Sequence, residues 1–206
     1  MTSTDAGDRL SRRRVDKFEE RRRLLADAAL QTLADRGYAR TSLRDIAQSS
    51  DFSLGVLHYY FRDKVELITY CVRRYKARCV ERYDTIAAHA TDAEQLLRDA
   101  GDGLAATLEQ DALLHRLWYD LRAQSLFDES FRLDVADIDA SLERMIWRIV
   151  DAYAGLAGAP PRCTSGLAYA AFDGLFQQAL LRHLAGDPAA LDDVRAGTRV
   201  LLTRLG

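Results

Sequence analysis

Apolar residues recur along most of this chain at the three- and four-residue spacing of helices that bury one face. The first such stretch covers residues 16–36 and ends before Gly37, a residue suited to a helix C-terminus. Ser42 can cap a second helix over residues 43–49, and a third short helix is expected over residues 53–59. The pattern therefore predicts two short helices braced by a longer one, which is the arrangement of a helix-turn-helix unit.

The same spacing predicts six more helices, which makes about nine in all. They cover approximately residues 63–88, 91–108, 111–126, 130–154, 164–184 and 188–205. Residues 63–66 and 91–94 each have the sequence of a capping box, and Asp187 with Pro188 offers an N-cap followed by a first-turn proline. Since the 206 residues include only 12 Gly and 3 Pro, the fold class is predicted to be all-α.

Composition narrows the class of protein further. With 48% hydrophobic residues and a net charge of −2, the chain is neither disordered nor collagen-like. No apolar run reaches the ~18 residues that a membrane span needs, and the polar N-terminus has no signal-peptide core, so no membrane partner is expected. Three cysteines cannot all pair with one another, which argues against a disulfide scaffold and predicts a reducing, cytoplasmic location.

Charge is divided unevenly along the sequence. Residues 1–64 hold 13 basic and 10 acidic side chains, a net of +3, whereas residues 65–206 hold 16 and 21, a net of −5. A basic head on an acidic body suits a polyanionic partner at one end only. We therefore expect a flexible basic arm over residues 1–15, a helix-turn-helix domain over residues 16–63, and a larger helical domain over residues 64–206.

Polar side chains gather where the short helices begin. Thr41, Ser42 and Arg44 lie at the N-terminus of the second helix, where hydroxyls, unpaired N–H groups and a guanidinium can hold a phosphate or a base. Lys64 stands at the start of the next long helix, again at the positive end of a helix dipole. This chemistry favours a nucleic acid as the polyanion.

These residues belong to a longer sequence pattern. It consists of RLLADAA over residues 23–29, GY over 37–38, TSLRDIA over 41–47, SLGVLHYYF over 53–61 and KVEL over 64–67. The pattern closely resembles the DNA-binding domain of TetR-type transcriptional repressors, over about 45 consecutive residues without a gap. Beyond a general helical organisation, the resemblance does not extend into the C-terminal two-thirds of the chain.

The resemblance implies a set of DNA-contacting positions. They are Ser42, Arg44, Ser53, Leu54, Gly55, Leu57, His58, Tyr59 and Lys64, to which the chemistry of the helix terminus adds Thr41. Lys64, with His58 or Tyr59, would hold phosphates. Arg44 is the candidate to read a guanine, and Gly55 would let the DNA approach the helix backbone closely.

Three positions depart from the family pattern. Residues 50–52 are Ser-Asp-Phe where the turn usually reads Ala-Gly-Val, and we expect Asp51 to accept a left-handed conformation at some strain. Leu54 replaces a frequently basic residue and would exchange a phosphate contact for a contact with a thymine methyl group. His58 occupies a usual tyrosine position. For Leu57, packing in the core is the alternative to a DNA contact.

The helix over residues 164–184 is apolar on two opposite sides. One side carries Leu167, Ala170, Ala171, Gly174 and Leu181, and the other carries Ala168, Phe172, Phe176, Ala179 and Leu180. Two apolar stripes indicate packing against the body and against a second subunit, with burial of both stripes inside one subunit as the alternative. The predicted homodimer interface consists of Phe172, Phe176, Ala179, Leu180 and His183.

The larger helical domain is rich in aromatic residues, which suggests a small-molecule pocket. The candidate lining residues are Tyr75, Cys79, Trp118, Arg122, Trp147 and Phe172. Arg122, one turn after Trp118, would suit an acidic ligand such as a carboxylate. Aromatic residues at helical spacing also pack in ordinary helical cores, and arginine also snorkels to the surface, so these alternatives stay open.

Catalytic, cofactor and metal motifs are missing from the sequence. It has neither a Gly-x-Ser-x-Gly turn nor a phosphate-binding loop, and its 4 His and 3 Cys show no paired metal-ligand spacing. We therefore expect a non-enzymatic, homodimeric repressor of the TetR type, released from a palindromic DNA operator by a small apolar or acidic effector. The alternatives are a DNA-binding regulator without an effector and, more remotely, an all-helical enzyme with a cryptic site.

Overall fold

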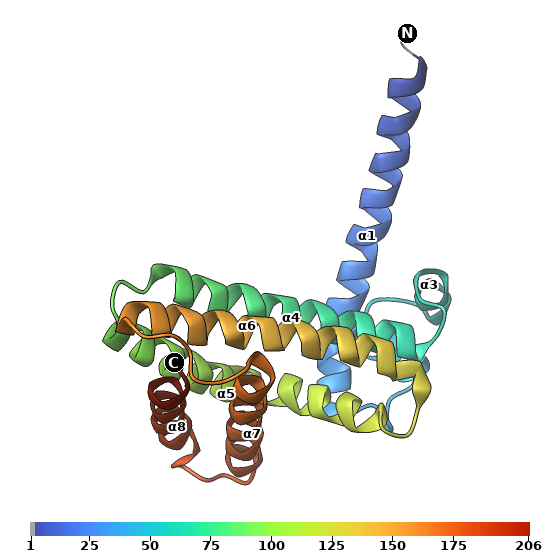
Figure 1. Ribbon diagram of the computed structural model, residues 1–206. Coiled ribbons are helices and arrows are strands. Elements are labelled where there is room, and N and C mark those ends of the chain that lie inside the picture. Colours follow the sequence, from blue (N-terminus) through green and yellow to red (C-terminus); the bar gives the residue numbers. More distant parts are fainter. Residues whose placement is uncertain (1–2) are drawn as a thin grey trace. The chain divides into compact units, whose positions relative to one another are not determined.

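The computed structural model describes the backbone of residues 3–206 and the side chains of residues 15–206. Over these residues the chain forms eight α-helices, one short 3-10 helix and no strand (Figure 1), which confirms the predicted all-α class. The helices are α1 (Ser3–Arg36), α2 (Leu43–Gln48), α3 (Leu54–Tyr60), α4 (Lys64–His89), α5 (Ala93–Gln124), η1 (Glu129–Phe131), α6 (Arg132–Ala157), α7 (Ser165–Leu184) and α8 (Ala190–Leu205). Two compact units, residues 1–72 and 73–206, divide the chain within α4.

The N-terminal unit is built on α1, which begins at Ser3 and not near residue 16 as expected. The basic arm predicted over residues 1–15 falls almost entirely outside the described side chains and stays a prediction. α1 contacts both α2 and α3. The core of this unit consists of apolar residues at helical spacing, among them Leu25, Ala29, Leu33, Leu43, Ile46, Leu57, Phe61, Leu67 and Ile68.

Side-chain caps fix where the two short helices start. Ser42 Oγ accepts a hydrogen bond from the Asp45 backbone N–H at 3.2 Å, and the Asp45 carboxylate accepts one from the Ser42 N–H at 2.8 Å, so both halves of a capping box form. Ser53 caps α3 by accepting from the Val56 N–H at 3.3 Å. These helices therefore begin where the sequence predicts.

The turn between α2 and α3 differs from the expectation. Among the described residues, only glycines have a positive φ, so Asp51 does not adopt the left-handed conformation and that prediction is wrong. Hydroxyl groups shape the turn instead. Ser49 Oγ lies 2.6 Å from Thr32 Oγ1 on α1, and the Ser50 hydroxyl accepts from the Phe52 N–H at 3.4 Å.

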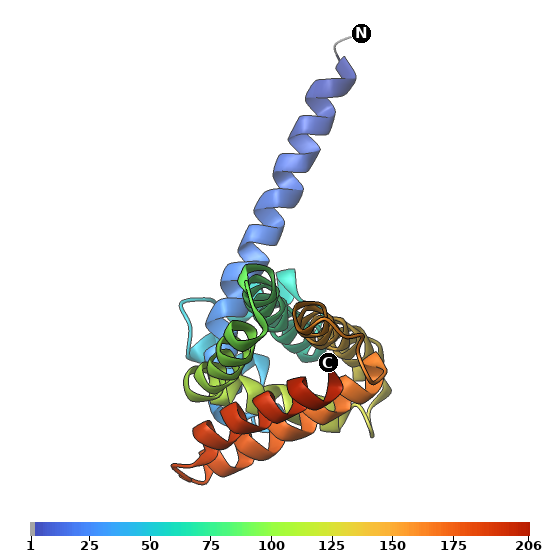
Figure 2. The same ribbon diagram turned by 60° about the vertical axis from the view of Figure 1, so that its left-hand side comes forward.

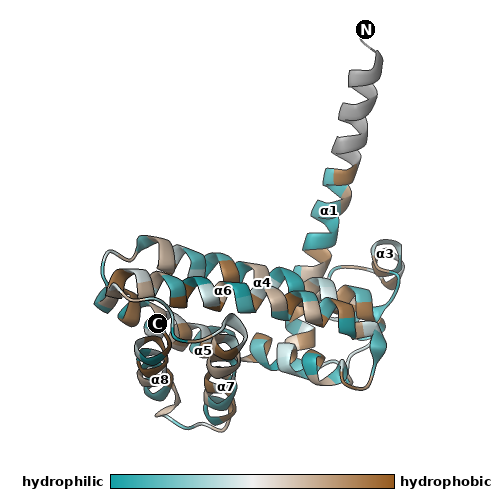
Figure 3. Ribbon diagram, viewed as in Figure 1, coloured by the Kyte–Doolittle hydropathy of each residue, from teal (hydrophilic) through white to brown (hydrophobic). Residues whose placement is uncertain are grey.

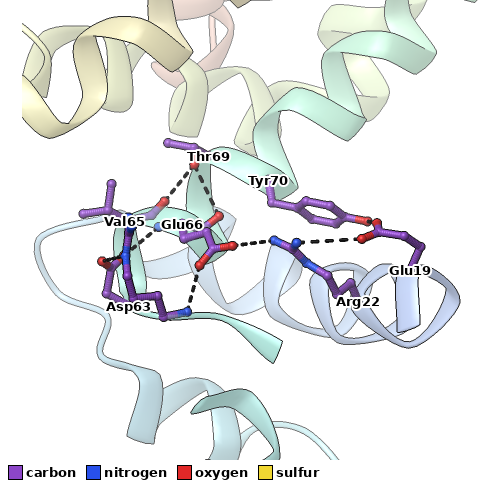
Figure 4. Close-up of polar contacts among 8 residues, drawn as sticks. Glu19, Arg22, Asp63, Val65, Glu66, Thr69 and Tyr70 are labelled. Carbon is purple, nitrogen blue, oxygen red and sulfur yellow. Dashed lines mark hydrogen bonds and ion pairs between the residues drawn. The ribbon is translucent and has the colours of Figure 1, made fainter. Parts of the chain in front are cut away.

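A charged cluster joins the middle of α1 to the start of α4 (Figure 4). The Arg22 guanidinium lies 2.7 Å from a Glu66 carboxylate oxygen and 3.8 Å from one of Glu19. Its Cζ stands 4.7 Å from the ring centroids of both Phe61 and Tyr70. The Tyr70 hydroxyl donates to Glu19 at 3.4 Å. Because rings and carboxylates both surround Arg22, the cluster fixes α1 against the segment that follows α3.

The C-terminal unit contains the second part of α4 and the helices α5 to α8 (Figure 1), with α7 and α8 lying side by side in both views (Figure 2). α5 contacts α6, α7 and α8, and α7 also contacts α6 and α8. Arg73 of α4 pairs with Asp134 of α6 at 2.5 Å, and Asp84 of α4 pairs with Arg148 of α6 at 2.8 Å. Because the residue numbers rise together along both helices, α4 and α6 run in the same direction.

α5 joins two helices that the sequence analysis predicted separately. It spans Ala93 to Gln124 and consists of two helical parts joined at Asp111, whose backbone is not helical (φ −120°, ψ 18°) and where the second helix was expected to start. Arg82 of α4 crosses the kink, donating to Thr107 Oγ1 at 2.8 Å and lying 3.5 Å from the Asp111 carboxylate. Buried residues lie on both sides of the kink, and the predicted division into two helices is confirmed at this residue.

Two predicted helix starts are displaced by one or two residues. The N-cap of α5 is Asp92 and not Thr91, because a carboxylate suits the positive end of a helix better than a hydroxyl does. α8 begins at Ala190, after a turn in which Asp187 accepts a backbone hydrogen bond. Pro188 therefore precedes the helix and is not its first residue.

The core of the C-terminal unit lies where α5, α7 and α8 meet. Its buried members include Ala105, Leu108, Ala112, Phe176, Ala179, Leu180 and Val194. α7 carries many apolar positions, coloured brown in Figure 3. Across residues 3–206, no helix combines the length and the apolar character that crossing a bilayer requires.

Candidate nucleic-acid interface and internal cavity

A surface hollow surrounds the N-terminus of α2 in the N-terminal unit. It is lined by residues 39–45 together with Leu54, His58 and Lys64. The hollow thus brings together more than half of the predicted DNA-contacting residues, namely Thr41, Ser42, Arg44, Leu54, His58 and Lys64. Arg40 lines the hollow as well, and the sequence analysis missed it. Its place in the short connection before α2 was the available signal.

Two arginines give the hollow an exposed positive charge. Arg44 is exposed, and within residues 15–206 no hydrogen bond or ion pair holds its guanidinium. Arg40 is exposed too, and its Nε donates to the Arg36 carbonyl at 3.2 Å. Lys64 is held more firmly, because its Nζ donates to the Tyr38 backbone carbonyl at 3.0 Å and stands 3.8 Å from the centroid of the Tyr38 ring. Lys64 therefore also stabilises the turn after α1.

The hydroxyl groups of the hollow are used inside the protein. Thr41 is buried, and its Oγ1 donates to the Gly37 carbonyl at 2.8 Å. The side chain therefore does not reach the surface, contrary to its predicted contact with DNA. Ser42 Oγ donates to the Asp45 carboxylate at 2.5 Å, and this hydrogen bond lowers the pKa of the Asp45 carboxyl group. Both hydroxyls therefore stabilise the start of α2.

α3 turns one face to solvent. Ser53, Gly55, His58 and Tyr59 are exposed on it, which suits residues that contact a partner. Leu57 is 0% exposed and packs in the core, so its predicted DNA contact is wrong. A Cβ at Gly55 would meet Ser53 Oγ at 3.9 Å and nothing closer, so packing within the chain does not require a glycine there.

Aromatic rings support the C-terminal end of α3. The rings of Tyr59 and Tyr60 stand 4.9 Å apart between centroids, and Phe18 of α1 lies 4.8 Å from Tyr60 and 6.2 Å from Tyr59. Tyr59 nevertheless remains 72% exposed. Its ring is therefore oriented by α1 while most of its surface stays available.

A cavity of about 60 Å³ lies inside the C-terminal unit, between α4, α5, α6 and α7. Three of the predicted pocket residues, Cys79, Trp118 and Phe172, line it. Leu142 and Met145 of α6 also belong to its wall. The cavity is therefore mostly apolar, as the sequence analysis expects of an effector pocket.

The other three predicted pocket residues do not line this cavity. Tyr75 is buried beside it, with its ring centroid 5.4 Å from that of His115. Arg122 lies behind the wall and pairs with Asp173 at 2.5 Å. Trp147 lines a separate hollow at the surface. Helical spacing placed Tyr75 on an inward-facing stripe and Trp147 off the core stripe of its helix, but it did not determine how deep each side chain lies.

Two polar residues of the cavity wall were missed by the sequence analysis. Lys76 is 5% exposed, and its Nζ lies 3.0 Å from His115 Nδ1. Because an ammonium only donates, Nδ1 accepts and the neutral imidazole carries its hydrogen on Nε2. The available signal was a lysine inside the apolar stripe of Val72, Cys79 and Tyr83.

Burial sets the protonation of this pair. It lowers the pKa of Lys76 to about 8, so the ammonium remains mostly protonated at neutral pH. Burial, together with the charge of Lys76, holds the pKa of His115 well below its ordinary value of 6.5. Within the described side chains, no carboxylate forms an ion pair with Lys76. The pair is therefore a buried positive charge beside an apolar cavity.

On the opposite wall, the carboxylates have partners. Asp173 accepts from the Tyr119 hydroxyl at 3.0 Å and from Arg122 at 2.5 Å. Asp139 accepts from the Tyr169 hydroxyl at 2.5 Å and lies 3.3 Å from Arg122. Arg122 thus serves two carboxylates, which leaves it less suited to bind an acidic ligand than the sequence analysis expected.

The side of α7 that was predicted to meet a second subunit is buried within its own subunit. This applies to Phe172, Phe176, Ala179 and Leu180, while His183 is half-buried. The predicted interface is therefore wrong for these four apolar residues, because they have no surface left to offer. The opposite side is open: Leu167 and Leu181 are 58% and 56% exposed, and a Cβ at Gly174 would meet nothing within 4 Å.

Known proteins resemble the N-terminal unit most clearly. Residues 25–71 match the family model described as bacterial regulatory proteins, tetR family. The chain is 31% identical to the transcriptional activator FasR of Mycolicibacterium smegmatis over 114 residues. These residues make up 55% of this chain and 49% of FasR. Over 129 residues the chain is 26% identical to the transcriptional repressor KstR of Mycobacterium tuberculosis, covering 63% of this chain and 58% of KstR. The chain thus spans about half the length of the curated relatives that it matches.

The likeness in fold covers more of the chain. The regulator FadR from Bacillus subtilis, solved in complex with stearoyl-CoA, matches with a TM-score of 0.72 at 16% identity, covering 88% of this chain and 98% of FadR. A TetR regulator from Haloarcula marismortui matches with a TM-score of 0.73 at 18% identity, covering 91% and 98%. At such identities the likeness establishes the fold. Residues 25–71 therefore form a domain of the tetR family of bacterial regulatory proteins, and the chain has the fold of these solved regulators.

Proposed function

We propose that this regulator is a repressor that binds a palindromic DNA operator as a homodimer and leaves it when a small-molecule effector binds. The observation that carries the proposal is the surface formed by α2 and α3. There Arg40 and Arg44 are exposed beside the solvent-facing side of α3, in a domain that the family model matches. Exposed cations around a short exposed helix suit the phosphates and base edges of a DNA major groove.

Each side chain of this surface has a distinct proposed role. α3 enters the major groove, where the missing side chain of Gly55 allows the DNA to come close to the helix. Arg44 reads a guanine, because its guanidinium has no partner in the described chain and its fork of donors fits guanine acceptors. Arg40, His58 and Tyr59 contact phosphates, with Lys64 oriented toward them by the Tyr38 carbonyl.

The exposed side of α7 supports the homodimer. Leu167, Leu181 and Leu184 of α7 are exposed, as is Val200 of the neighbouring α8. Large apolar side chains gathered on neighbouring helices are typical of a protein interface. A homodimer would carry two helix-turn-helix units, one for each half-site of a palindromic operator.

The dimer proposal is tested by placing a charge on that face. Leu181→Glu should give a folded monomer in sedimentation velocity, because a carboxylate in an apolar interface is costly whereas at the surface of one subunit it is not. The operator affinity of this monomer should fall strongly. Leu133→Glu is the matched control, since Leu133 is 83% exposed on α6 and not on α7. A dimeric Leu181→Glu protein would contradict the proposed interface.

The cavity supports control by an effector. α4 carries Lys64 at its first residue and Cys79 in the cavity wall, and at ~1.5 Å per residue these positions are about 22 Å apart on one helix. A ligand that prefers a tilted α4 would therefore disfavour the arrangement that binds DNA. Relatives in fold bind unlike molecules: one was solved with stearoyl-CoA and another, from Saccharomonospora viridis, with choline.

The operator itself supplies the decisive test. Selection from a random DNA library should return a palindrome, and affinity for it should fall steeply with salt because several phosphate contacts release counterions. Placing the selected site over a promoter should then lower transcription when the protein is added. Increased transcription would assign the protein to the activators, of which FasR is one by its description. Selection of no sequence at all would contradict sequence-specific binding.

A further inference from the structure

The cavity wall contains hydrogen-bond donors that lack acceptors. Lys76 donates one hydrogen bond to His115, which leaves its other ammonium hydrogens without a described acceptor. His115 Nε2 is buried and has no hydrogen-bond partner within residues 15–206. Buried donors without acceptors are rare in folded proteins. We call Lys76 and His115, which both line the cavity, the donor cluster.

The donor cluster also carries a positive charge that no described carboxylate contacts as an ion pair. The carboxylates nearest to balancing it, Asp139 and Asp173, already bind Arg122 and two tyrosine hydroxyls on the opposite wall. The π faces of Trp118 and Tyr75 lie 5.3 Å and 5.6 Å from Lys76 Nζ and stabilise a cation only weakly. The group that would complete this cluster is therefore an anion that accepts several hydrogen bonds.

The remainder of the cavity is suited to an apolar group. Trp118 and Phe172 face it together with Leu142 and Met145 of α6. Its volume of about 60 Å³ admits a few heavy atoms, so a longer ligand has to displace side chains. Met145 is unbranched and adapts its shape easily, which makes it the side chain most able to move.

A second hollow connects the donor cluster with the surface. It has a volume of about 340 Å³, lies between α4 and α6, and shares Lys76 with the inner cavity. Its lining includes the small residues Ala77, Ala140 and Ser141. Arg144 is exposed there and has no ion-pair partner in the described chain. The lining also holds Arg73 and one carboxylate, Asp137, so its cations outnumber its anions, which favours the entry of an anion.

We propose that the effector of this protein is a small apolar carboxylate, held by its carboxylate at the donor cluster and by its apolar part against Trp118 and Phe172. It enters between α4 and α6. The inference rests on the proposed function, because it names the chemical class of the effector. It also moves the binding of the acidic group from Arg122, where the sequence analysis placed it, to Lys76.

The test uses Trp118 as a reporter. A Trp147→Phe variant leaves Trp118 as the single tryptophan, so its fluorescence reports on the cavity alone. The probes are octanoate and phenylacetate, each compared with its neutral alcohol, octanol and 2-phenylethanol. Because a buried ammonium binds a carboxylate through charge-assisted hydrogen bonds, each carboxylate should bind at least about tenfold more tightly than its alcohol.

Variants then assign the preference to the donor cluster. Lys76→Met should remove the preference for carboxylates and leave alcohol binding unchanged, which also shows that the cavity is intact. His115→Gln, which retains a donor, should weaken carboxylate binding less. Lys17→Met is the matched control, because it makes the same substitution at an exposed lysine of α1.

The inference is overturned if no carboxylate quenches Trp118, if the alcohols bind as tightly, or if Lys76→Met retains the preference. Operator release, measured in parallel with the same four probes, tests the proposed function separately from this inference. Quenching by carboxylates without release would uphold the binding site and contradict effector control. Release by alcohols but not by carboxylates would uphold effector control and overturn the inference.

Discussion

Arg44 and Lys76 place a positive charge in opposite surroundings, one in each unit of the chain. Arg44 lies exposed at the start of α2, while Lys76 is 5% exposed beside an apolar cavity. Water solvates the first in the folded and the unfolded protein alike. The second loses its solvation on folding, which lowers the pKa of Lys76 to about 8.

The difference predicts how binding and stability are related in each unit. At the surface of α2 and α3, a cation can serve a partner without lowering the stability of the free protein. In the cavity, the buried charge destabilises the free protein and would be stabilised again by a bound anion. Removing the charge of Lys76 should therefore change the stability of the free protein, whereas removing the charge of Arg44 should not.

Arg44→Ala should have the largest effect of the predicted changes, and on DNA binding alone. Losing a bidentate contact to guanine should cost on the order of 1–3 kcal/mol per half-site and relax the preference at one base pair. The free energy of unfolding should change by less than about 0.5 kcal/mol, because the side chain is exposed. Lys64→Ala is the comparison: it should weaken binding to all sequences equally and also lower stability, since it removes the hydrogen bond to Tyr38. Equal losses on every sequence for Arg44→Ala would contradict base reading.

Lys76→Met should change stability and leave DNA binding unchanged. Replacing a buried, unpaired ammonium by an apolar side chain of similar length should raise the free energy of unfolding by about 1–3 kcal/mol at pH 7. Operator affinity without effector should stay the same. Thermal or urea unfolding measures the first effect and a DNA titration the second. A variant less stable than the wild type would mean that Lys76 stabilises the fold, and the contrast with Arg44 would be lost.

The cost of burying the Lys76 charge should also make the free energy of unfolding depend on pH. The folded chain releases the Lys76 proton near pH 8 and the unfolded chain near 10.5, so between these values the unfolded chain binds more protons. The free energy of unfolding should therefore rise with pH in this interval, toward the value of Lys76→Met. The charged or titratable groups around Lys76 are Cys79 on α4, His115 and Arg122 on α5, Asp139 on α6 and Asp173 on α7.

Buried tyrosines act in the opposite direction at higher pH. Burial raises the pKa values of Tyr75, Tyr83, Tyr119 and Tyr169, so their ionisation in the unfolded chain lowers stability above about pH 10. The difference between wild type and Lys76→Met removes this common contribution. A difference that does not shrink between pH 7 and 9.5 would contradict the lowered pKa of Lys76.

Gly55→Ala should raise stability slightly, in a direction opposite to its effect on binding. Alanine favours a helix over glycine by up to about 1 kcal/mol, and its Cβ would meet nothing in the chain closer than 3.9 Å. The variant should therefore unfold at a slightly higher temperature while binding the operator more weakly, because the methyl group stands where DNA approaches. Unchanged operator affinity would show that α3 does not approach DNA through Gly55.

Much of the N-terminal unit follows from local sequence. Ser42 and Ser53 specify the starts of α2 and α3 through hydrogen bonds that span three residues, so the chain near each serine contains the whole signal. The family pattern added the positions exposed on α3. It did not distinguish Leu57, which is in the core, from its exposed neighbours, and it gave Asp51 a conformation that the hydroxyls of Ser49 and Ser50 make unnecessary.

The C-terminal unit was predicted less completely, for a physical reason. Its helices follow from apolar spacing, and the division expected near Asp111 is present as a kink with non-helical backbone at that residue. However, α7 has two apolar sides, and local sequence does not say which one packs inside the subunit. Contacts with α5 and α8 bury Phe176 and leave Leu181 exposed.

The sequence by itself determined the all-α class and the helix-turn-helix with its family pattern, while only Cys79, Trp118 and Phe172 of its six candidate pocket residues line the cavity. Helix periods, caps and a gapless motif are local properties, and each can be deduced from a few neighbouring residues. Only the tertiary structure decided that Lys76 meets His115, residues 39 positions apart, and that Arg122 is bound by carboxylates from two other helices. The depth and partners of a side chain depend on how helices pack, and this packing is set by contacts between segments distant in sequence.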